Sequence, residues 1–363
     1  MENNIIIRAG SRCCPGHIVD DSLRDDTLTH LSDLKSECSF NRTDILNLLE
    51  QIREIALKSQ NKCIDFDLDS FMSDADYRNL MRLSKLSFHD LCSHVSEIRN
   101  SKNRSLRTCI GIYLTKLRSG MLNRLLSPIF NIGMDAIKRS IWSARKALSK
   151  DFTPHHIGFE HITRDTIADK HTTDLAKTLF GGPHNPAILV IDGTYIYIQK
   201  SSQFSVQRKS FSMHKKRPLV KPMMIVSSTG YYVSVLGLYL SNNKNNDAKI
   251  IMHALSNNVE SMKSWLNEDD VIIVDRGFRD SLEFLHELGI KTEIPSFLKK
   301  GQKQHDVVDS NSSRLTTKIR WIVESANGRM KCWKYLANVV PNSQIPNIGD
   351  DVRLVCVIYQ TNI

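Results

Sequence analysis

Two short apolar runs that each end in an aspartate constrain the fold of this chain more than any other feature. Asp192 follows Ile188–Ile191, and Asp275 follows Val271–Val274. Four consecutive apolar residues of mostly β-branched type predict a buried strand. A carboxylate at the end of such a strand is costly unless it is paired or bound to a metal ion. A glycine follows each aspartate within two residues, which leaves room for a bulky ligand to approach the backbone.

The elements around these two runs predict an α/β catalytic domain over residues 187–363. Strands are expected at 188–198, 219–226, 231–239 and 271–274, and helices at 247–255, 281–288 and 318–336. The turn at 227–230 makes the first three strands antiparallel. Three strands, a helix, a strand and further helices are the order of a ribonuclease H-like fold.

A third acid lies on the last predicted helix. Arg320, Glu324, Asn327 and Lys331 share the side opposite the apolar residues, which are Ile319, Ile322, Ala326, Met330 and Trp333. Glu324 is either a metal ligand or one half of an exposed ion pair with Arg320. Carboxylates on rigid elements supply the oxygen ligands that two Mg²⁺ ions need for phosphoryl transfer. We therefore predict Asp192, Asp275 and Glu324 as catalytic, metal-binding residues.

Asp247 is the first acid after a long basic stretch. Residues 193–246 contain eight basic residues and no acid, including Lys215, Lys216 and Arg217, and this pattern predicts a groove for DNA. Asp247 either caps the helix that begins there or joins the metal site. A second acidic group, Glu268, Asp269 and Asp270, precedes a strand, and we expect it to be solvated.

Residues 73–150 predict an all-α, DNA-binding helix-turn-helix domain. Ser73 is an expected N-cap, a helix is expected at 106–119, and helices at 122–130 and 134–148 flank a break at 131–133. Residues 76–150 carry 15 basic and 4 acidic residues. The candidate DNA contacts are Lys138, Arg139, Arg145 and Lys146. A helical bundle with a basic, solvated face is the alternative.

The remaining segments are an acidic N-terminal arm at 1–72 and a connector at 151–186. The arm predicts one helix at 44–57, and the connector one helix at 164–179. Cys13, Cys14 and His17 are either the remnant of a zinc module or ordinary free residues, because adjacent cysteines lack the usual spacer. The formal charge of +10 favours a polyanionic partner. Without a signal segment or a long apolar run, we expect a soluble, intracellular protein with no membrane contact.

Five motifs in order closely resemble the Harbinger-like DDE superfamily endonucleases. They are Asp192-Gly-Thr-Tyr, Gln207-Arg-Lys-Ser-Phe-Ser-Met-His-Lys-Lys-Arg-Pro, Asn245-Asn-Asp-Ala-Lys, Asp275-Arg-Gly-Phe-Arg-Asp and Arg320-Trp-Ile-Val-Glu324. The preceding helix-turn-helix is also similar to the one in those transposases. The resemblance implies a nuclear enzyme that cuts double-stranded DNA at transposon ends and joins the 3′-hydroxyl to target DNA, with two Mg²⁺ or Mn²⁺ ions. It also implies a homo-oligomer, and the reduced N-terminal zinc module leaves room for a separate DNA-binding partner protein.

Two other functions stay open at this point. A domesticated DNA-binding protein would keep the motifs without using their catalytic activity. A ribonuclease H-type RNA nuclease is disfavoured by the helix-turn-helix, which reads duplex DNA in its major groove.

Overall fold

The computed structural model describes residues 16, 18–19, 22–23, 41–60, 64–68, 72–98, 104–242, 244–298, 301–302 and 304–361. Cys13, Cys14 and His17 lie outside these residues. The chain divides into two compact units, Met1–Asn61 and Lys62–Ile363. In the first, β1 (Ile18–Val19) pairs with β2 (Ser22–Leu23) in antiparallel register. The helix expected at 44–57 is confirmed as α2 (Arg42–Gln60).

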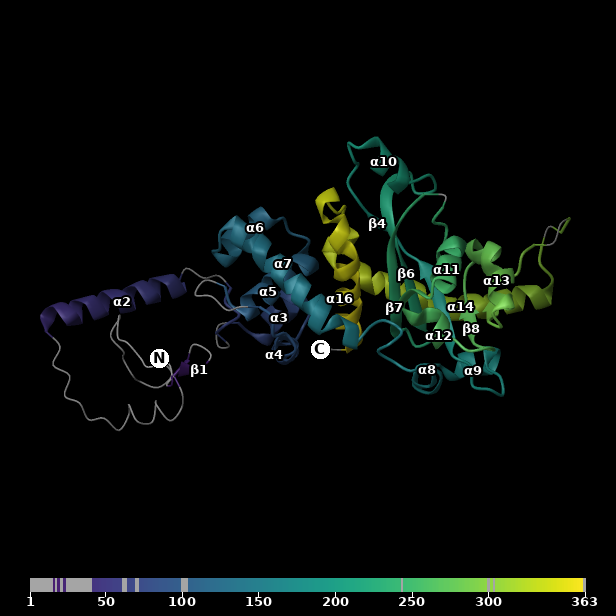
Figure 1. Ribbon diagram of the computed structural model, residues 1–363, viewed down its shortest axis with the longest axis horizontal. Coiled ribbons are helices and arrows are strands. Elements are labelled where there is room, and N and C mark those ends of the chain that lie inside the picture. The colour runs from purple at the N-terminus through teal and green to yellow at the C-terminus, as the bar shows by residue number, and fades with distance from the viewer. Residues whose placement is uncertain are drawn as a thin grey trace. The chain divides into compact units, whose positions relative to one another are not determined.

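Five helices form the first part of the larger unit (Figure 1). They are α3 (Asp74–Met81), α4 (Lys85–Ser93), α5 (Leu106–Ser119), α6 (Asn123–Phe130) and α7 (Met134–Asp151). Ser73 caps α3 with a capping box, as expected, and Gly120 ends α5 in the left-handed conformation. The helices α6 and α7 are joined by the predicted three-residue break. That this pair binds DNA stays a prediction.

The connector contains two helices after the 3-10 turn η2 (Thr153–His155), where one was predicted. They are α8 (Arg164–Lys170) and α9 (Asp174–Phe180). The side chain of Thr173 accepts a hydrogen bond from the backbone N–H of Ala176 and so begins a new helix. The apolar spacing continues across this break, which is why the sequence pattern predicted a single helix.

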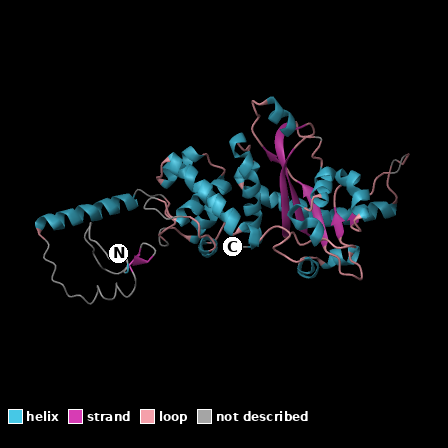
Figure 2. Ribbon diagram, viewed as in Figure 1, coloured by secondary structure: helices cyan, strands magenta, loops and turns pink. Residues whose placement is uncertain are grey.

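One mixed sheet forms the centre of the C-terminal part (Figure 2). Its strands are β3 (Ile188–Gly193), β4 (Ile196–Tyr197), β5 (Phe211–Ser212), β6 (Arg217–Ser227), β7 (Tyr232–Leu240), β8 (Val271–Ile273) and β9 (Lys291–Glu293). The expected antiparallel trio is confirmed, because β6 pairs with both β3 and β7. On its other edge β3 pairs in parallel with β8, which pairs in parallel with β9. This mixed α/β arrangement is consistent with a ribonuclease H-like domain.

Helices pack on both faces of this sheet. They are α10 (Phe204–Ser210), α11 (Asp247–Ser256), η3 (Val259–Ser261), α12 (Met262–Trp265), η4 (Arg276–Ser281), α13 (Leu282–Glu287), α14 (Val307–Lys331), α15 (Lys334–Ala337), η5 (Asn342–Asn347) and α16 (Ile348–Thr361). The predicted helix 318–336 is instead α14 followed by the short α15. The first three turns of α14 begin at the N-cap Asp306 and are mostly polar, so apolar spacing did not reveal them. The sequence pattern also missed β9 and α16.

Alternation along β3 directs its residues into two hydrophobic cores. Ile188 and Val190 pack in a core with α14, α16 and the helices α3–α7, whereas Leu189 and Ile191 pack in a core with α11 and α13. Asp192 continues the first set and therefore faces α14. Within the described ranges, no helix is long and apolar enough to span a membrane.

Candidate active site

Asp192 lies at the carboxyl end of β3, where the strand meets α14. Its side chain is only 9% exposed. The amide Nδ2 of Asn327, on α14, donates a hydrogen bond to Asp192 Oδ2 over 3.3 Å. Asn327 is itself 6% exposed, so this contact is inside the protein. It fixes the carboxylate against the helix that carries Glu324.

Asp275 follows β8, the parallel neighbour of β3. Val190 is paired with Ile273, so the two strands end at the same edge of the sheet and their aspartates are neighbours. The Asp275 Oδ1 atom accepts a hydrogen bond from the backbone N–H of Gly277 over 2.8 Å and caps η4. A Cβ atom at Gly277 would lie 2.9 Å from the same oxygen. The glycine therefore makes room for the carboxylate itself.

Glu324 projects from the polar face of α14, as the periodicity predicted. Its side chain is about half exposed, and its Oε1 atom lies 3.4 Å from Nη1 of Arg320. The expected ion pair with Arg320 is thus present. Asn327 lies one turn further along the same helix and contacts Asp192. Glu324 can pair with Arg320 and still lie near Asp192, because Arg320, Glu324 and Asn327 are on the same face of α14.

Asp247 does not cap α11; that interpretation was wrong. The side chain of Asn246 accepts the hydrogen bond from the N–H of Lys249, over 2.9 Å, and is the N-cap. The Asp247 carboxylate instead forms an ion pair of 2.5 Å with Lys221. A Cβ atom at Gly193 would lie 2.5 Å from Asp247 Oδ1, so this glycine lets the carboxylate lie against the end of β3. Asp247 is therefore a neighbour of Asp192.

The pKa of Asp192 reflects the other three acids. Burial, together with the negative charges of Glu324, Asp275 and Asp247, raises the pKa of Asp192 to about 7, while Arg320 opposes the shift. Each of these acids thus lies close enough to disfavour ionisation of Asp192. The sheet edge carries a surplus of negative charge that a bound cation would relieve.

The donor set fits a hard divalent cation. It consists of carboxylate oxygens together with Oδ1 of Asn327, a buried amide oxygen without a hydrogen-bond partner. Among the described residues, no three acidic, histidine or cysteine side chains are already gathered in metal-binding geometry. Protein donors hold the carboxylates instead: Asn327, Arg320, Lys221 and the Gly277 N–H.

The raised pKa of Asp192 predicts a pH-dependent stability in the absence of metal. A carboxyl whose folded pKa exceeds its unfolded value destabilises the fold as pH rises from about 4 to 7. We expect Asp192→Asn to be more stable than the wild type at pH 8 in EDTA, by up to about 4 kcal/mol, and equally stable at pH 4. Urea unfolding across this range measures the difference. A constant difference at every pH would contradict the assigned cause.

Basic and aromatic side chains flank the acids. The Lys331 Nζ atom lies 3.9 Å from the centroid of the Tyr195 ring, and that of Lys215 lies 4.8 Å from the same centroid. The guanidinium of Arg217 lies 5.3 Å from the centroid of the Tyr197 ring. Desolvation lowers the pKa of Lys331, although Tyr195, Glu324 and Asp192 oppose the shift. These cations are held by tyrosine rings.

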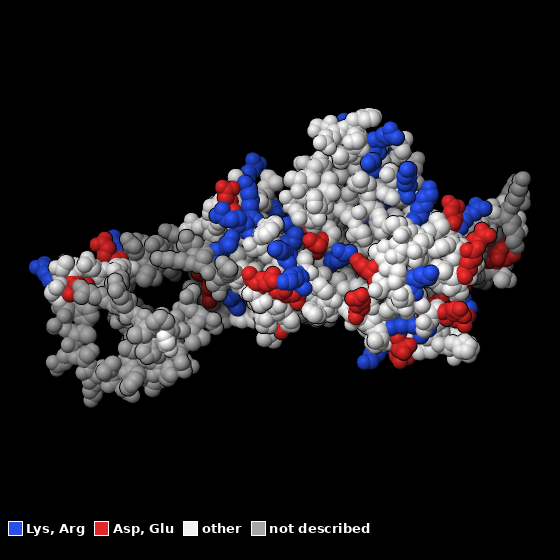
Figure 3. Space-filling model, in the orientation of Figure 1, with Lys and Arg blue, Asp and Glu red and all other residues white. Residues whose placement is uncertain are grey.

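Three of the four basic residues predicted on α7 are exposed, and one is not. Lys138, Arg139 and Lys146 lie on the solvent side, where lysine and arginine side chains gather over α6 and α7 (Figure 3). Arg145 is only 5% exposed, and its Nε atom donates to Asp351 Oδ1 over 2.8 Å. Its role as a DNA contact is therefore corrected, because its charge is neutralised inside the protein.

The expected solvation of the second acidic group was also wrong for one member. Asp270 is fully buried, where it accepts hydrogen bonds from Arg164 and from the backbone N–H groups of Ala187 and Asn267. It joins the connector to the strand that carries Asp192. Asp269 stays at the surface in an ion pair with Lys291.

Sequence reasoning left out three side chains that this arrangement brings to the acids. Asn327 and Lys331 share the helix face of Glu324, so a signal for both was present in the periodicity. Tyr195 lies three residues after Asp192. Its position under two lysines depends on the turn before β6, which carries Lys215, and on α14, which carries Lys331, so local sequence does not reveal it.

Residues 191–360 match the model of a family described as DDE superfamily endonuclease. The matched segment covers just under half of the chain and contains all four acids of the site. The match supports a relationship to DDE transposase-like proteins, whose endonucleases act on DNA and use divalent metal ions. No curated protein matches the chain.

Proposed function

We propose that this chain is a metal-dependent DNA endonuclease that acts as a Harbinger-like transposase. Two observations carry the proposal: the parallel pairing of β3 with β8, which brings Asp192 beside Asp275, and the hydrogen bond from Asn327 to Asp192, which sets the helix face of Glu324 against the same sheet edge. The family match over the same segment supports it. Its reaction is the cutting of transposon ends and their joining to target DNA.

The three acids would hold two Mg²⁺ or Mn²⁺ ions, and Asp247 completes the cluster. When bound, such ions activate an attacking oxygen and stabilise a leaving oxygen at phosphorus. Asn327 orients the Asp192 carboxylate. Lys331 lies near Asp192 and Glu324, and Lys215 lies over the same Tyr195 ring as Lys331. Both lysines would contact the phosphates of the cleaved strand.

The proposed substrate is double-stranded DNA, which the exposed cations of α7 bind before cleavage. A homo-oligomer would provide one active site for each transposon end, and a separate DNA-binding protein could assist recognition of the ends. Because the substrate is genomic, we place the protein in the nucleus.

The exposed face of α7 predicts a salt-dependent affinity for duplex DNA. Replacing Lys138, Arg139 and Lys146 with alanine should lower the slope of log K against log salt by up to about 0.9 for each DNA phosphate that the variant no longer neutralises. Fluorescence anisotropy at several salt concentrations measures this slope. Lys138 already forms an ion pair with Asp135 over 3.1 Å, so Arg139 and Lys146 are expected to contribute most of the change. Lys150→Ala on the same helix is the control for a paired cation, because Lys150 is paired with Glu97. Equal slopes for the triple variant and the control would remove α7 from the DNA interface.

Substitutions of Asp247 and of its neighbour Asn246 distinguish a role in the active site from a role in helix capping. We expect Asp247→Asn to lower cleavage about 10–100-fold, as removal of a group supporting a metal ligand does, and to leave the melting temperature nearly unchanged. Asn246→Ala should do the opposite, with a loss of about 1 kcal/mol in stability and normal cleavage below the melting temperature. Normal cleavage by Asp247→Asn would place Asp247 outside the chemistry.

One experiment distinguishes an active nuclease from a domesticated DNA-binding protein. The full chain is incubated with a plasmid that carries the DNA flanking its own coding sequence, in Mg²⁺, in Mn²⁺ or in EDTA. We expect nicks or breaks at the flanking ends in either metal and none in EDTA. Binding without cleavage in either metal would support the domesticated alternative.

A further inference from the structure

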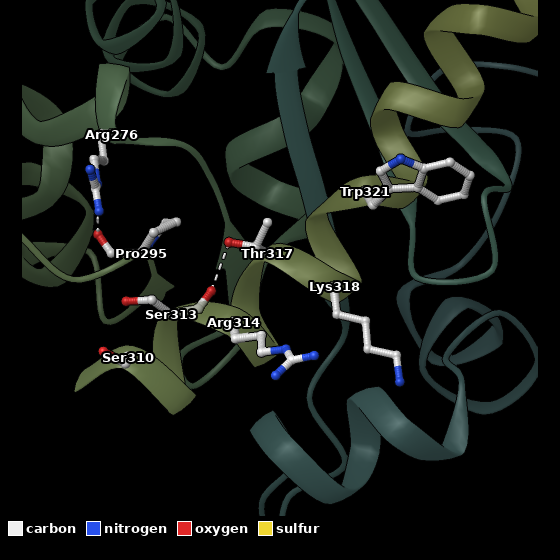
Figure 4. A pocket seen from close by; sticks show the side chains of 8 residues that line it. All are labelled: Arg276, Pro295, Ser310, Ser313, Arg314, Thr317, Lys318 and Trp321. Carbon is white, nitrogen blue, oxygen red and sulfur yellow. Dashed lines mark hydrogen bonds between the residues drawn. The ribbon is translucent and has the colours of Figure 1, made fainter. Parts of the chain in front are cut away.

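A groove of about 520 Å³ runs along the N-terminal half of α14 (Figure 4). Its basic lining residues are Arg276, Arg314 and Lys318, and the rest are serine, threonine and proline side chains with Trp321. None of these lining residues is acidic. The groove is therefore positively charged and also offers hydroxyl groups, which is the chemistry that binds phosphate oxygens.

Two of the three cations of the groove are available to a ligand. Arg314 and Lys318 are one helical turn apart, exposed, and project to the same side of α14 (Figure 4). Within the described part of the chain, neither forms an ion pair with an acid. Arg276 forms the other wall, where its Nη2 atom donates to the backbone oxygen of Ser296 over 2.8 Å. Neighbouring phosphates could be bound without breaking an ion pair at the two helix positions.

Trp321 adds a large aromatic surface at one end of the groove. Its side chain is 65% exposed, although an indole of this size is usually mostly buried. Exposed aromatic rings beside cations are typical of surfaces that bind nucleic-acid strands, because the ring packs against a base or sugar.

Two residues of the groove are close in the chain to two of the acids. Arg276 follows Asp275 in the chain, and Trp321 precedes Glu324 by three residues. From Arg314 to Trp321 the helix rises about 10 Å, which equals about three base-pair steps along the axis of a DNA duplex. A strand with its reacting phosphate at the acids would have the following phosphates along this groove.

We infer that the groove along α14 binds the sugar–phosphate backbone of the DNA strand that leaves the active site. Arg314 and Lys318 contact its phosphates, Arg276 adds positive charge from the opposite wall, and Trp321 packs against a deoxyribose or an unstacked base. This surface is separate from the exposed face of α7. The inference rests on the proposed function, because it takes the four acids as the place where DNA is held.

The test measures binding of a fluorescein-labelled DNA duplex by the full chain in EDTA, so that cleavage plays no part. We expect Arg314→Ala with Lys318→Ala to lower the slope of log K against log salt by about 1.8. The control pair, Lys170→Ala with Lys263→Ala, removes the same charge from exposed sites on α8 and α12 and should leave the slope unchanged. Trp321→Ala should weaken binding about 10-fold, and Trp321→Phe should restore most of the affinity.

Melting temperatures show whether each variant is folded, and Arg314→Gln with Lys318→Gln replaces the alanine pair if that pair is unstable. An unchanged slope in the groove variants, with normal binding by the wild type, would show that the groove does not bind DNA and would leave the proposed function standing. Absence of DNA binding by the wild type would overturn both.

Discussion

Asp192→Asn, Asp275→Asn and Glu324→Gln are each expected to lower metal-dependent DNA cleavage by at least about 10³-fold. Each change keeps the size of the side chain and removes one negative oxygen ligand. Loss of about 4 kcal/mol of transition-state stabilisation, an ordinary value for a metal-held phosphoryl group, corresponds to this factor. Single-turnover cleavage of flanking DNA in saturating Mg²⁺ measures it.

DNA binding should survive these three substitutions, because the exposed cations of α7 and α14 are unchanged. Glu283→Gln is a matched control, since Glu283 is an exposed acid on α13 outside the site. Normal turnover by any one of the three variants would remove that residue from the catalytic set, whereas a loss in Glu283→Gln would indicate a nonspecific effect of charge.

Asp351→Ala is expected to destabilise the larger unit by about 3–5 kcal/mol. Asp351 is fully buried on α16, and Tyr113 Oη donates to its Oδ1 atom over 2.5 Å, as does Arg145 Nε over 2.8 Å. Removing the carboxylate leaves the Arg145 charge buried without its acidic partner, and this costs more than the pair contributes. The melting temperature should fall by at least about 6 °C.

Asp350→Ala is the matched control, because this neighbouring acid on the same helix is only partly buried. A melting temperature for Asp351→Ala equal to that of Asp350→Ala would mean that water reaches Arg145. The double variant Arg145→Met with Asp351→Leu should recover much of the lost stability, since apolar residues of similar volume often replace a buried pair well.

The two aspartates could be predicted from sequence because their signal is local. A buried strand is recognisable from four apolar residues, and Asp192 and Asp275 stand out at the ends of two such runs. The parallel pairing of β3 with β8 then brings them together. The prediction of Glu324 depended on helix periodicity, which shows on which face of the helix a residue lies but not which residues contact it.

The errors arose where a partner far away in sequence decides the environment of a residue. Arg145 has the spacing of a surface cation, but its partner Asp351 is 206 residues away. Asp270 has the context of a solvated turn, but Arg164 and the start of β3 surround it. Asn246 and Asp247 are both good helix caps, so only the hydrogen bond to Lys249 decides between them.

Titration of the full chain with Mn²⁺, followed by electron paramagnetic resonance of the free ion, shows whether these acids hold metal. We expect the wild type to bind two Mn²⁺ ions per chain and Glu283→Gln to do the same. Asp192→Asn and Asp275→Asn should each lose or greatly weaken at least one of these ions, because each removes a ligand of the cluster. Mn²⁺ binding by both variants at wild-type affinity and stoichiometry would contradict the claim that these acids hold the metal.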